Sequence, residues 1–256
     1  MNTNTQKTAL VTGASRGMGR ATALALGRAN VRVFVHYGRS TAEANSAVQE
    51  IRAAGGQAEA VQADLETADG PIDLAKKVRE LAQVGLDILV ANAGVSKGLP
   101  FEAYKLEDFD RLYAINVRAP FFLVQQALPF INEGGCIVLV SSVLAHFAVS
   151  NAGQKDAPSM AAYAATKGAI NTLVKHWAAM LGPRKIRVNG VAPGVIETDL
   201  SSFTKTEVGR NLAMGMQALK RIGQPSDVAD VTAFLCSDHA RWITGAVLPV
   251  DGGSKL

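Results

Sequence analysis

Cysteine, long apolar runs and clusters of basic residues are scarce in this 256-residue chain, and each scarcity excludes a class of protein. The two cysteines, Cys136 and Cys236, stand far apart and outside any CxxC or Cys/His ligand spacing, so we expect neither a metal site nor a disulfide. No uninterrupted apolar run reaches the roughly 18 residues of a membrane span. Residues 1–6 are polar and too short for a signal peptide. We therefore expect a soluble, cytoplasmic protein without a membrane partner.

The formal charge of +4 comes from lysines and arginines that are scattered along the whole chain. A nucleic-acid-binding surface needs these residues in a cluster, so we expect no nucleic-acid partner. With 48% hydrophobic and 19% charged residues, the chain can bury a full core. No composition break, low-complexity stretch or internal repeat marks a linker, which predicts a single domain over residues 1–256.

Apolar runs of the β type alternate with segments of helical periodicity from one end of the chain to the other. The runs occupy residues 8–12, 31–36, 57–61, 86–90, 136–141, 186–191 and 246–250. Seven strands separated by six helices predict an α/β fold with a doubly wound parallel sheet, because parallel strands need crossovers, which place helices on both faces. In the helix expected over residues 71–84, Pro71 suits the first position, and Ile72, Leu74 and Val78 belong to the inward stripe. Ligands of such sheets bind at the carboxyl ends of the strands.

A glycine-rich loop follows the first expected strand. It contains Gly13, Gly17 and Gly19 in the spacing Gly-x-x-x-Gly-x-Gly and leads into the apolar helical segment 21–29. Glycines let a backbone turn sharply and approach a pyrophosphate, and the N–H groups and dipole of the following helix attract negative charge. The spacing departs from the usual Gly-x-Gly-x-x-Gly fingerprint, and glycine clusters also occur in plain tight turns. A phosphate loop and a simple turn both stay open at this point.

Tyr163 and Lys167 are four residues apart in an expected helix, which places them on the same face. A free phenol has a pKa of roughly 10, and a fixed cation nearby stabilises phenolate and lowers that pKa. The pair is therefore a candidate acid–base unit that exchanges a proton near neutral pH. The alternative is a solvated helix face, since this spacing occurs on many helices.

Eight motifs, in this order along the chain, carry a resemblance to a known family. They are Thr12-Gly13-x-x-x-Gly17-x-Gly19, Asp64-Leu65, Asn92-Ala93-Gly94, Asn116, Ser142, Tyr163-x-x-x-Lys167, Pro193-Gly194 and Asp251-Gly252-Gly253. Together they resemble a short-chain dehydrogenase/reductase over nearly the whole chain. The run at residues 221–229 is similar to that of 3-oxoacyl-carrier-protein reductases, but it recurs in sugar, steroid and small-ketone reductases. The resemblance implies a Rossmann-type fold and an oxidoreductase that transfers a hydride between a nicotinamide dinucleotide and a ketone or secondary alcohol.

The resemblance also implies a catalytic set of four residues. Tyr163 would exchange a proton with the substrate oxygen, and Lys167 would lower the pKa of the tyrosine and bind the nicotinamide ribose. Ser142 would donate a hydrogen bond to the same oxygen, with the neighbouring Ser141 as its structural competitor. Asn116 would kink its helix and hold a water for proton relay. Taken alone, an amide in this apolar stretch indicates a cap or a buried hydrogen bond.

Cofactor choice depends on the end of the second expected strand, where an acidic residue binds the ribose 2′-hydroxyl when NAD is preferred. Here no carboxylate occurs before Glu43, Tyr37 takes the acidic position, and Arg39 and Arg16 are available for a 2′-phosphate. NADP is therefore the expected cofactor. By resemblance, Asp64 would bind the adenine amino group, whereas an aspartate at such a position is by itself more often a helix cap. By resemblance, the cofactor contacts are Gly13, Ser15, Arg16, Gly17, Met18, Gly19, Tyr37, Gly38, Arg39, Ser40, Asp64, Leu65, Asn92, Ala93, Gly94, Tyr163, Lys167, Pro193, Gly194, Val195, Ile196 and Thr198.

Two variable segments are expected to set the choice of substrate. Residues 143–160 are longer than in most family members, and residues 195–222 resemble the substrate lid of the family. The expected substrate contacts are Ser142, Leu144, Phe147 and Tyr163. On the lid, an apolar inner face would consist of Phe203, Leu212, Met214, Met216 and Leu219.

The resemblance implies a homotetramer built through the helices that carry Asn116 and Tyr163. An apolar stripe suits such a contact but equally suits an internal core; it consists of Leu173, Val174, Trp177 and Leu181. A different class of function, a protein that senses NADP without catalysis, is disfavoured because the four catalytic residue types are all present.

Overall fold

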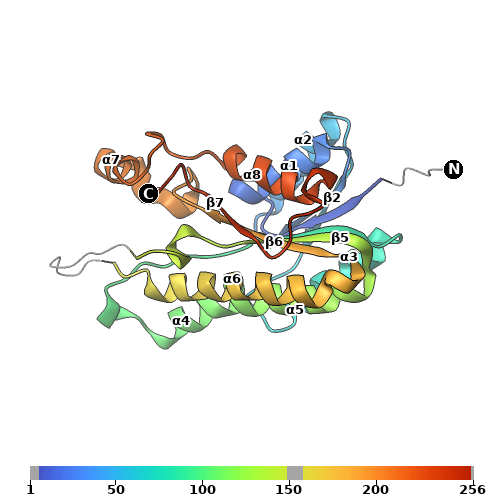
Figure 1. Cartoon of the computed structure of the whole chain (residues 1–256), viewed down its shortest axis with the longest axis horizontal. Helices are drawn as coiled ribbons and strands as arrows, with labels where there is room; N and C mark the ends of the chain where they lie inside the picture. Colours follow the sequence, from blue (N-terminus) through green and yellow to red (C-terminus); the bar gives the residue numbers. More distant parts are fainter. Residues whose placement is uncertain (1–5, 149–157, 255–256) are drawn as a thin grey trace.

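The computed structural model describes residues 6–148 and 158–254, and within them one sheet of seven strands lies between two layers of helices (Figure 1). The strands are β1 (Thr8–Val11), β2 (Arg32–Tyr37), β3 (Ala58–Gln62), β4 (Leu86–Ala91), β5 (Ile131–Val140), β6 (Arg187–Pro193) and β7 (Val247–Val250). Every neighbouring pair is parallel, so the predicted doubly wound, Rossmann-type sheet is confirmed. Residues 149–157, the centre of the predicted 143–160 segment, lie outside the described residues.

Eight α-helices connect these strands in the described part of the chain, whereas six were predicted. They are α1 (Gly17–Arg28), α2 (Thr41–Ala53), α3 (Gly70–Ala82), α4 (Leu106–Tyr113), α5 (Ala119–Ala127), α6 (Ala161–Leu181), α7 (Glu207–Gly215) and α8 (Pro225–Cys236). The additional helices arise because two crossovers are interrupted. A π-helical turn, Ala114–Arg118, separates α4 from α5, and the segment after β6 forms η6 (Asp199–Lys205) and α7 before α8 begins.

The strand order β3-β2-β1-β4-β5-β6-β7 reverses direction between β1 and β4. In a doubly wound sheet, the loops on either side of such a reversal leave a crevice at the carboxyl ends of the strands. The register aligns Val11 with Val35 on one side and with Val90 on the other. The segments that follow β1, β2 and β4 therefore meet at the same edge of the sheet.

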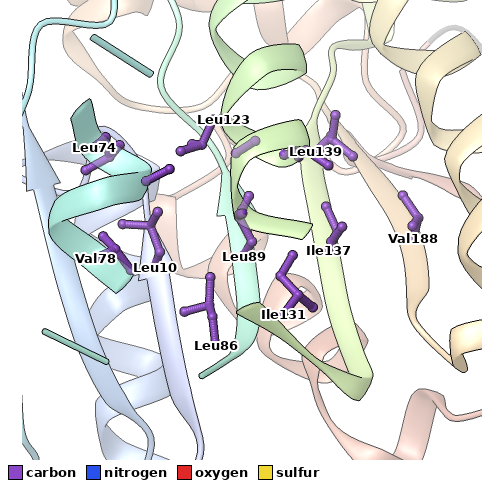
Figure 2. Close-up of a cluster of buried hydrophobic side chains, with 14 of the residues drawn as sticks. Leu10, Leu74, Val78, Leu86, Leu89, Leu123, Ile131, Ile137, Leu139 and Val188 are labelled. Atoms are coloured by element: carbon purple, nitrogen blue, oxygen red, sulfur yellow. The ribbon is translucent and has the colours of Figure 1, made fainter. Parts of the chain in front are cut away.

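Both faces of the sheet are buried, because successive side chains of each strand point to opposite faces and helices cover both. On one face Leu10, Leu89 and Leu139 pack against helices, from which Figure 2 shows Leu74 and Leu123. On the other face the alternate residues of the same strands pack against α1, α2 and α8. Figure 1 shows α5 and α6 below the sheet and α1, α2 and α8 above it. The sheet is thus a packed platform from which the carboxyl-edge loops project.

Helix α3 differs from the prediction at its end and at one position of its inward stripe. It ends at Ala82 instead of residue 84. Leu74 and Val78 are fully buried, but Ile72 is 41% exposed. Because each residue of an α-helix turns about 100° from the last, a helix that points Pro71, Leu74 and Val78 inward carries position 72 toward solvent.

The two cysteines, which are far apart in the sequence, meet in the structure. Cys136 lies in β5, Cys236 is the last residue of α8, and the Cys136 thiol donates a 3.4 Å hydrogen bond to the carbonyl oxygen of Leu235, the neighbour of Cys236. Both are buried and free. Within residues 6–148 and 158–254, no three His, Cys, Asp or Glu side chains gather as metal ligands, and no helix has the length and apolar content to cross a membrane.

Candidate active site

The loop between β1 and α1 is shaped for the close approach of a ligand. Gly13 and Gly17 adopt positive φ angles of 63° and 57°, which residues with a Cβ rarely adopt. A Cβ on Gly19 would lie 2.3 Å from the Gly13 carbonyl oxygen, so the loop requires glycine there. Arg16, the N-cap of α1, makes no side-chain capping hydrogen bond, and the first turn of α1 holds no acidic residue. The first N–H groups of α1 can therefore receive an anion such as a pyrophosphate, which favours the phosphate-loop interpretation.

Thr12 and Asn92 tie this glycine loop to the end of β4. The Asn92 amide donates to the Thr12 carbonyl oxygen at 2.8 Å and to the Gly13 carbonyl oxygen at 3.3 Å. The Thr12 hydroxyl accepts hydrogen bonds from the N–H groups of Asn92 and Ala93, both at 2.9 Å. The two segments that flank the reversal of strand order are thereby held at a fixed spacing.

His36, near the end of β2, is hydrogen-bonded to the same loop from the opposite side. This residue was not among those predicted from the sequence. Its Nδ1 accepts a hydrogen bond from the Gly13 N–H at 3.0 Å, and its Nε2 lies 3.1 Å from the Ala63 carbonyl oxygen. Burial lowers the pKa of His36 to about 4, so the imidazole is neutral near pH 7. The available signal was a titratable residue within an apolar strand, since a buried polar group needs partners.

Tyr163 and Lys167 lie near the start of α6, on the shared face that their spacing predicts. Lys167 is buried, and its ammonium donates a 2.8 Å hydrogen bond to the Val140 carbonyl oxygen at the end of β5. Its Nζ is 5.7 Å from the centre of the Tyr163 ring. The alternative of a solvated helix face therefore does not apply to Lys167.

The two serines after β5 have different partners. The Ser142 hydroxyl lies close enough to the Tyr163 phenol to lower its pKa, and it accepts a 3.2 Å hydrogen bond from the Leu144 N–H. The Ser141 hydroxyl lies 2.6 Å from Asn171 Oδ1 and 3.2 Å from the Lys167 carbonyl oxygen, so it fastens β5 to α6. Ser142 is thus the serine whose hydroxyl meets the phenol. Leu144 and Phe147, the other predicted substrate contacts, are half-buried in the segment that follows.

Asn116 lies in the π-helical turn between α4 and α5, where the family resemblance implies a kink. Its Oδ1 accepts from the Val95 N–H at 2.9 Å, and its Nδ2 donates to the Val95 carbonyl oxygen at 2.9 Å and to Thr166 Oγ1 at 3.1 Å. A Cβ on Gly94 would lie 3.3 Å from Asn116 Oδ1 and 3.5 Å from Lys167 Nζ. Asn116 therefore makes the buried hydrogen bonds that were one sequence-based alternative, and these bonds connect the segment after β4 with α6.

Burial sets the direction of both pKa shifts in the tyrosine–lysine pair. Burial raises the pKa of the Tyr163 phenol, and the hydrogen bond with Ser142 opposes that shift. Burial lowers the pKa of Lys167 to about 8. The expected lowering of the Tyr163 pKa by Lys167 is not what this structure shows, because desolvation dominates and the ammonium is bonded to Val140. A protonated phenol is the form that can donate a proton to a ketone.

The lowered pKa of Lys167 predicts a pH-dependent difference in stability between the wild type and Lys167→Met. Between about pH 8 and 10.5 the unfolded chain keeps a proton that the folded chain has released. The free energy of unfolding of the wild type should therefore rise relative to that of the variant, by about 2 kcal/mol between about pH 7 and 9.5. Urea unfolding at both pH values measures the difference. Lys175→Met, at an exposed position of the same helix, is the control, and a difference independent of pH would contradict the burial of a charge.

Two arginines occupy the edge where a 2′-phosphate is expected. The Arg39 side chain is 85% exposed and lies 3.7 Å from an Asp64 carboxylate oxygen. Arg16 lies 3.3 Å from an Asp199 oxygen, and both of those side chains are largely exposed. Exposed ion pairs contribute at most about 1 kcal/mol, so each arginine can exchange its carboxylate for a phosphate.

The remaining predicted cofactor contacts follow β6 at the same edge. Gly194 packs against the C-terminal loop, where a Cβ would lie 2.8 Å from the Asp251 Cα. Thr198 lies beside the glycine loop, where a Cβ added to Gly17 would be 3.4 Å from the Thr198 methyl group. The described structure therefore brings the segments after β1, β4, β5 and β6 together with the start of α6.

The lid segment 195–222 leaves its larger apolar side chains accessible. Phe203, Leu212 and Leu219 are 45%, 59% and 60% exposed, so they are not packed into the core of the chain. Met214 and Met216 are half-buried.

Comparison with known proteins agrees with this geometry. A family profile described as Enoyl-(Acyl carrier protein) reductase matches residues 13–255. Versicolorin reductase 1 of Aspergillus parasiticus is 39% identical over 97% of this chain and 96% of its own length. The angucycline C-6 ketoreductase LanV, solved with bound NADP, is 39% identical, covers 97% of this chain and 95% of its own, and superposes with a TM-score of 0.89. A short chain dehydrogenase from Burkholderia cenocepacia, solved in complex with NADP, is 35% identical, covers 98% of both chains and has a TM-score of 0.91.

These matches span nearly the whole chain, and they accompany the parallel sheet, the glycine loop and the tyrosine–lysine pair described above. The chain belongs to the short-chain dehydrogenase/reductase family.

Proposed function

We propose that this chain is an NADP-dependent oxidoreductase that interconverts a ketone and a secondary alcohol. The observation that carries the proposal is the grouping of Asn116, Ser142, Tyr163 and Lys167 beside a glycine loop whose helix has a free N-terminus. Two relatives at 35% identity or more are solved with NADP, and LanV is named a ketoreductase. A small-molecule carbonyl or alcohol compound is the substrate.

Four side chains carry the chemistry. The nicotinamide supplies or accepts the hydride. Tyr163 gives its proton to the carbonyl oxygen during reduction and takes one from the alcohol during oxidation. Ser142 donates a hydrogen bond to the same oxygen, where negative charge develops. Lys167 binds the ribose hydroxyls, and Asn116 holds the end of the β4 segment against α6.

The cofactor fits the residues that are present. The uncapped N-terminus of α1 suits the pyrophosphate, and Arg16 and Arg39 suit the 2′-phosphate. Asp64 and Leu65 follow β3 and suit the adenine. The other proposed contacts are the remaining positions of the set given above, from Gly13 to Thr198.

We assign the whole chain to one domain in which the two variable segments, 143–160 and 195–222, select the substrate. The C-terminal loop supports the end of the lid, since the Leu219 N–H donates to the Gly252 carbonyl oxygen at 2.9 Å. The narrower assignment to a 3-oxoacyl-carrier-protein reductase has no specific support, because the relatives described above are named for versicolorin and angucycline reduction. The proposal therefore stays at the level of a ketone or secondary alcohol.

The test is NADPH oxidation, followed by absorbance, against a panel of cyclic ketones, diketones, 3-oxoacyl thioesters, aldehydes and sugars. We expect turnover with at least one ketone and a clear preference for NADPH over NADH. A wild type that binds NADPH but turns over no carbonyl compound would favour the other class of function, an NADP-sensing protein without catalysis.

We further propose that the chain assembles as a homotetramer through α4, α5 and α6. A hollow of about 670 Å³ lies between these helices and is lined by Phe121, Phe122 and Leu173. Phe121 and Phe122 are 39% and 37% exposed. The other three residues of the predicted apolar stripe are buried in the chain's own core, so that stripe as a whole is not the contact surface.

The assembly predicts a scattering mass of about four times 26.9 kDa. Phe121→Asp should lower the mass by placing a charge in the hollow. Phe101→Asp, at a 72% exposed position outside the hollow, should not. A wild type that scatters only as a monomer would reject the assembly.

A further inference from the structure

The imidazole of His36 is hydrogen-bonded to two parts of the proposed cofactor site, the glycine loop and the segment after β3. The imidazole is 2% exposed and lies between the glycine loop and the segment that follows β3. The Gly13 N–H can only donate, so Nδ1, at 3.0 Å, must be the unprotonated nitrogen. The proton of the neutral ring is then on Nε2, which donates to the Ala63 carbonyl oxygen at 3.1 Å. A single tautomer therefore satisfies both hydrogen bonds.

The main chain of His36 holds the next residue of the loop as well. The Ala14 N–H donates to the His36 carbonyl oxygen at 2.8 Å. Two successive N–H groups of the glycine loop, those of Gly13 and Ala14, are thus taken by one residue. Gly13 has a φ of 63°, so the bond to Nδ1 holds the residue at which the chain turns from β1 toward α1. The turn keeps its shape because both of these donors are occupied.

The two hydrogen-bonding partners of the His36 ring, Gly13 and Ala63, lie in different parts of the proposed cofactor site. Gly13 opens the loop that receives the pyrophosphate, and Ala63 immediately precedes Asp64, at the proposed adenine position. We propose that His36 is a positioning residue for the dinucleotide, which fixes the spacing between the pyrophosphate loop and the adenine wall. The inference rests on the proposed function and concerns binding, because His36 is not among the four residues that act on the substrate.

Two substitutions distinguish the hydrogen bond made by Nδ1 from the one made by Nε2. Asparagine places an oxygen near the position of Nδ1 and keeps an acceptor for the Gly13 N–H, whereas glutamine reaches the position of Nε2 and keeps a donor for Ala63. Leucine removes both. Both changes leave the buried Gly13 N–H without its acceptor, so we expect His36→Leu and His36→Gln to raise the Kd for NADPH about 10-fold or more. His36→Asn should stay within about threefold of the wild type, since it retains the Gly13 arm.

Fluorescence titration with NADPH gives the Kd, and turnover at saturating NADPH gives kcat, which should stay within about twofold in all three variants. Hydrogen exchange at the Gly13 amide, measured without nucleotide, should be slow in the wild type and His36→Asn and faster in the other two. A folded His36→Leu that binds NADPH as the wild type does would falsify the proposal. The opposite order of the other two variants would also contradict it: His36→Gln binding NADPH as tightly as the wild type while His36→Asn binds it more weakly. This comparison tests the proposal even if His36→Leu does not fold. Failure of the wild type itself to bind NADPH would overturn the proposed function and this inference together.

Discussion

Replacing Tyr163 with phenylalanine is expected to lower kcat about 1,000-fold while the Kd for NADPH stays within about threefold, because general acid–base catalysis contributes about 10²–10⁴ to rate. The substitution removes one hydroxyl and keeps the ring. In the structure that hydroxyl meets Ser142, and burial keeps the phenol protonated. Of the two expected cofactor contacts in α6, the substitution leaves Lys167 in place and removes only the hydroxyl of Tyr163. Single-turnover kinetics with a ketone from the panel, together with NADPH titration, measure the two quantities separately.

The matched control is Tyr113→Phe, which removes a hydroxyl from α4, where the ring stacks on Phe109 at 4.6 Å between ring centroids. Turnover of this variant should equal that of the wild type. If Tyr163→Phe kept a tenth or more of the wild-type kcat, the phenol would not be the proton donor. A separate outcome, in which the wild type and Tyr163→Phe both bind NADPH normally and neither turns over any ketone of the panel, would favour the NADP-sensing function.

Replacing Arg39 with aspartate is expected to raise the Kd for NADPH about 100-fold and to lower that for NADH, which reverses the cofactor preference. A charge-assisted hydrogen bond to a phosphate contributes about 1.5–3 kcal/mol, and the new carboxylate repels the phosphate in addition. The same carboxylate can accept a hydrogen bond from the 2′-hydroxyl of NADH. Arg39 can supply this interaction because its present partner, Asp64, lies at 3.7 Å in an exposed pair that stabilises the chain little.

Arg241→Asp makes the same change in net charge at the opposite edge of the sheet and serves as the control. The turn that holds Arg241 follows Asp238, which is ion-paired with Lys7 at the start of β1. This variant should keep the wild-type preference for NADPH. Should Arg39→Asp retain full NADPH affinity and gain none for NADH, the 2′-phosphate position would have to be reassigned, with Arg16 as the next residue to test.

Local patterns were sufficient to predict the sheet and the position of the candidate site. Each strand is marked by its own apolar run, and parallel strands bring their carboxyl ends to one edge whatever the details of the helices. The shared face of Tyr163 and Lys167 follows from helical spacing alone. Ser142 and Ser141 could be separated only by resemblance, because their different partners come from α6.

Two features that the sequence did not reveal, the contacts of His36 and the raised pKa of Tyr163, depend on segments that are distant in the sequence. His36 becomes informative only when Gly13 and Ala63 are seen on its two nitrogens. The raised pKa of Tyr163 was also missed, because desolvation by the folded chain outweighs the charge that spacing places nearby.

The long helix α6 has consequences for how catalysis and assembly relate. Its inner side bears the phenol and the buried amine, while its outer side contributes Ala169, Thr172 and Leu173 to the hollow between the helices. The same helix, α6, therefore lines both the candidate active site and the hollow between α4, α5 and α6. If a neighbouring subunit packed on the outer side of α6, the contact would restrict the tilting and fraying of this helix. The Tyr163 hydroxyl would then occupy a narrower range of positions. Assembly would then lower the conformational entropy of the catalytic residues, although no residue of one subunit enters the active site of another.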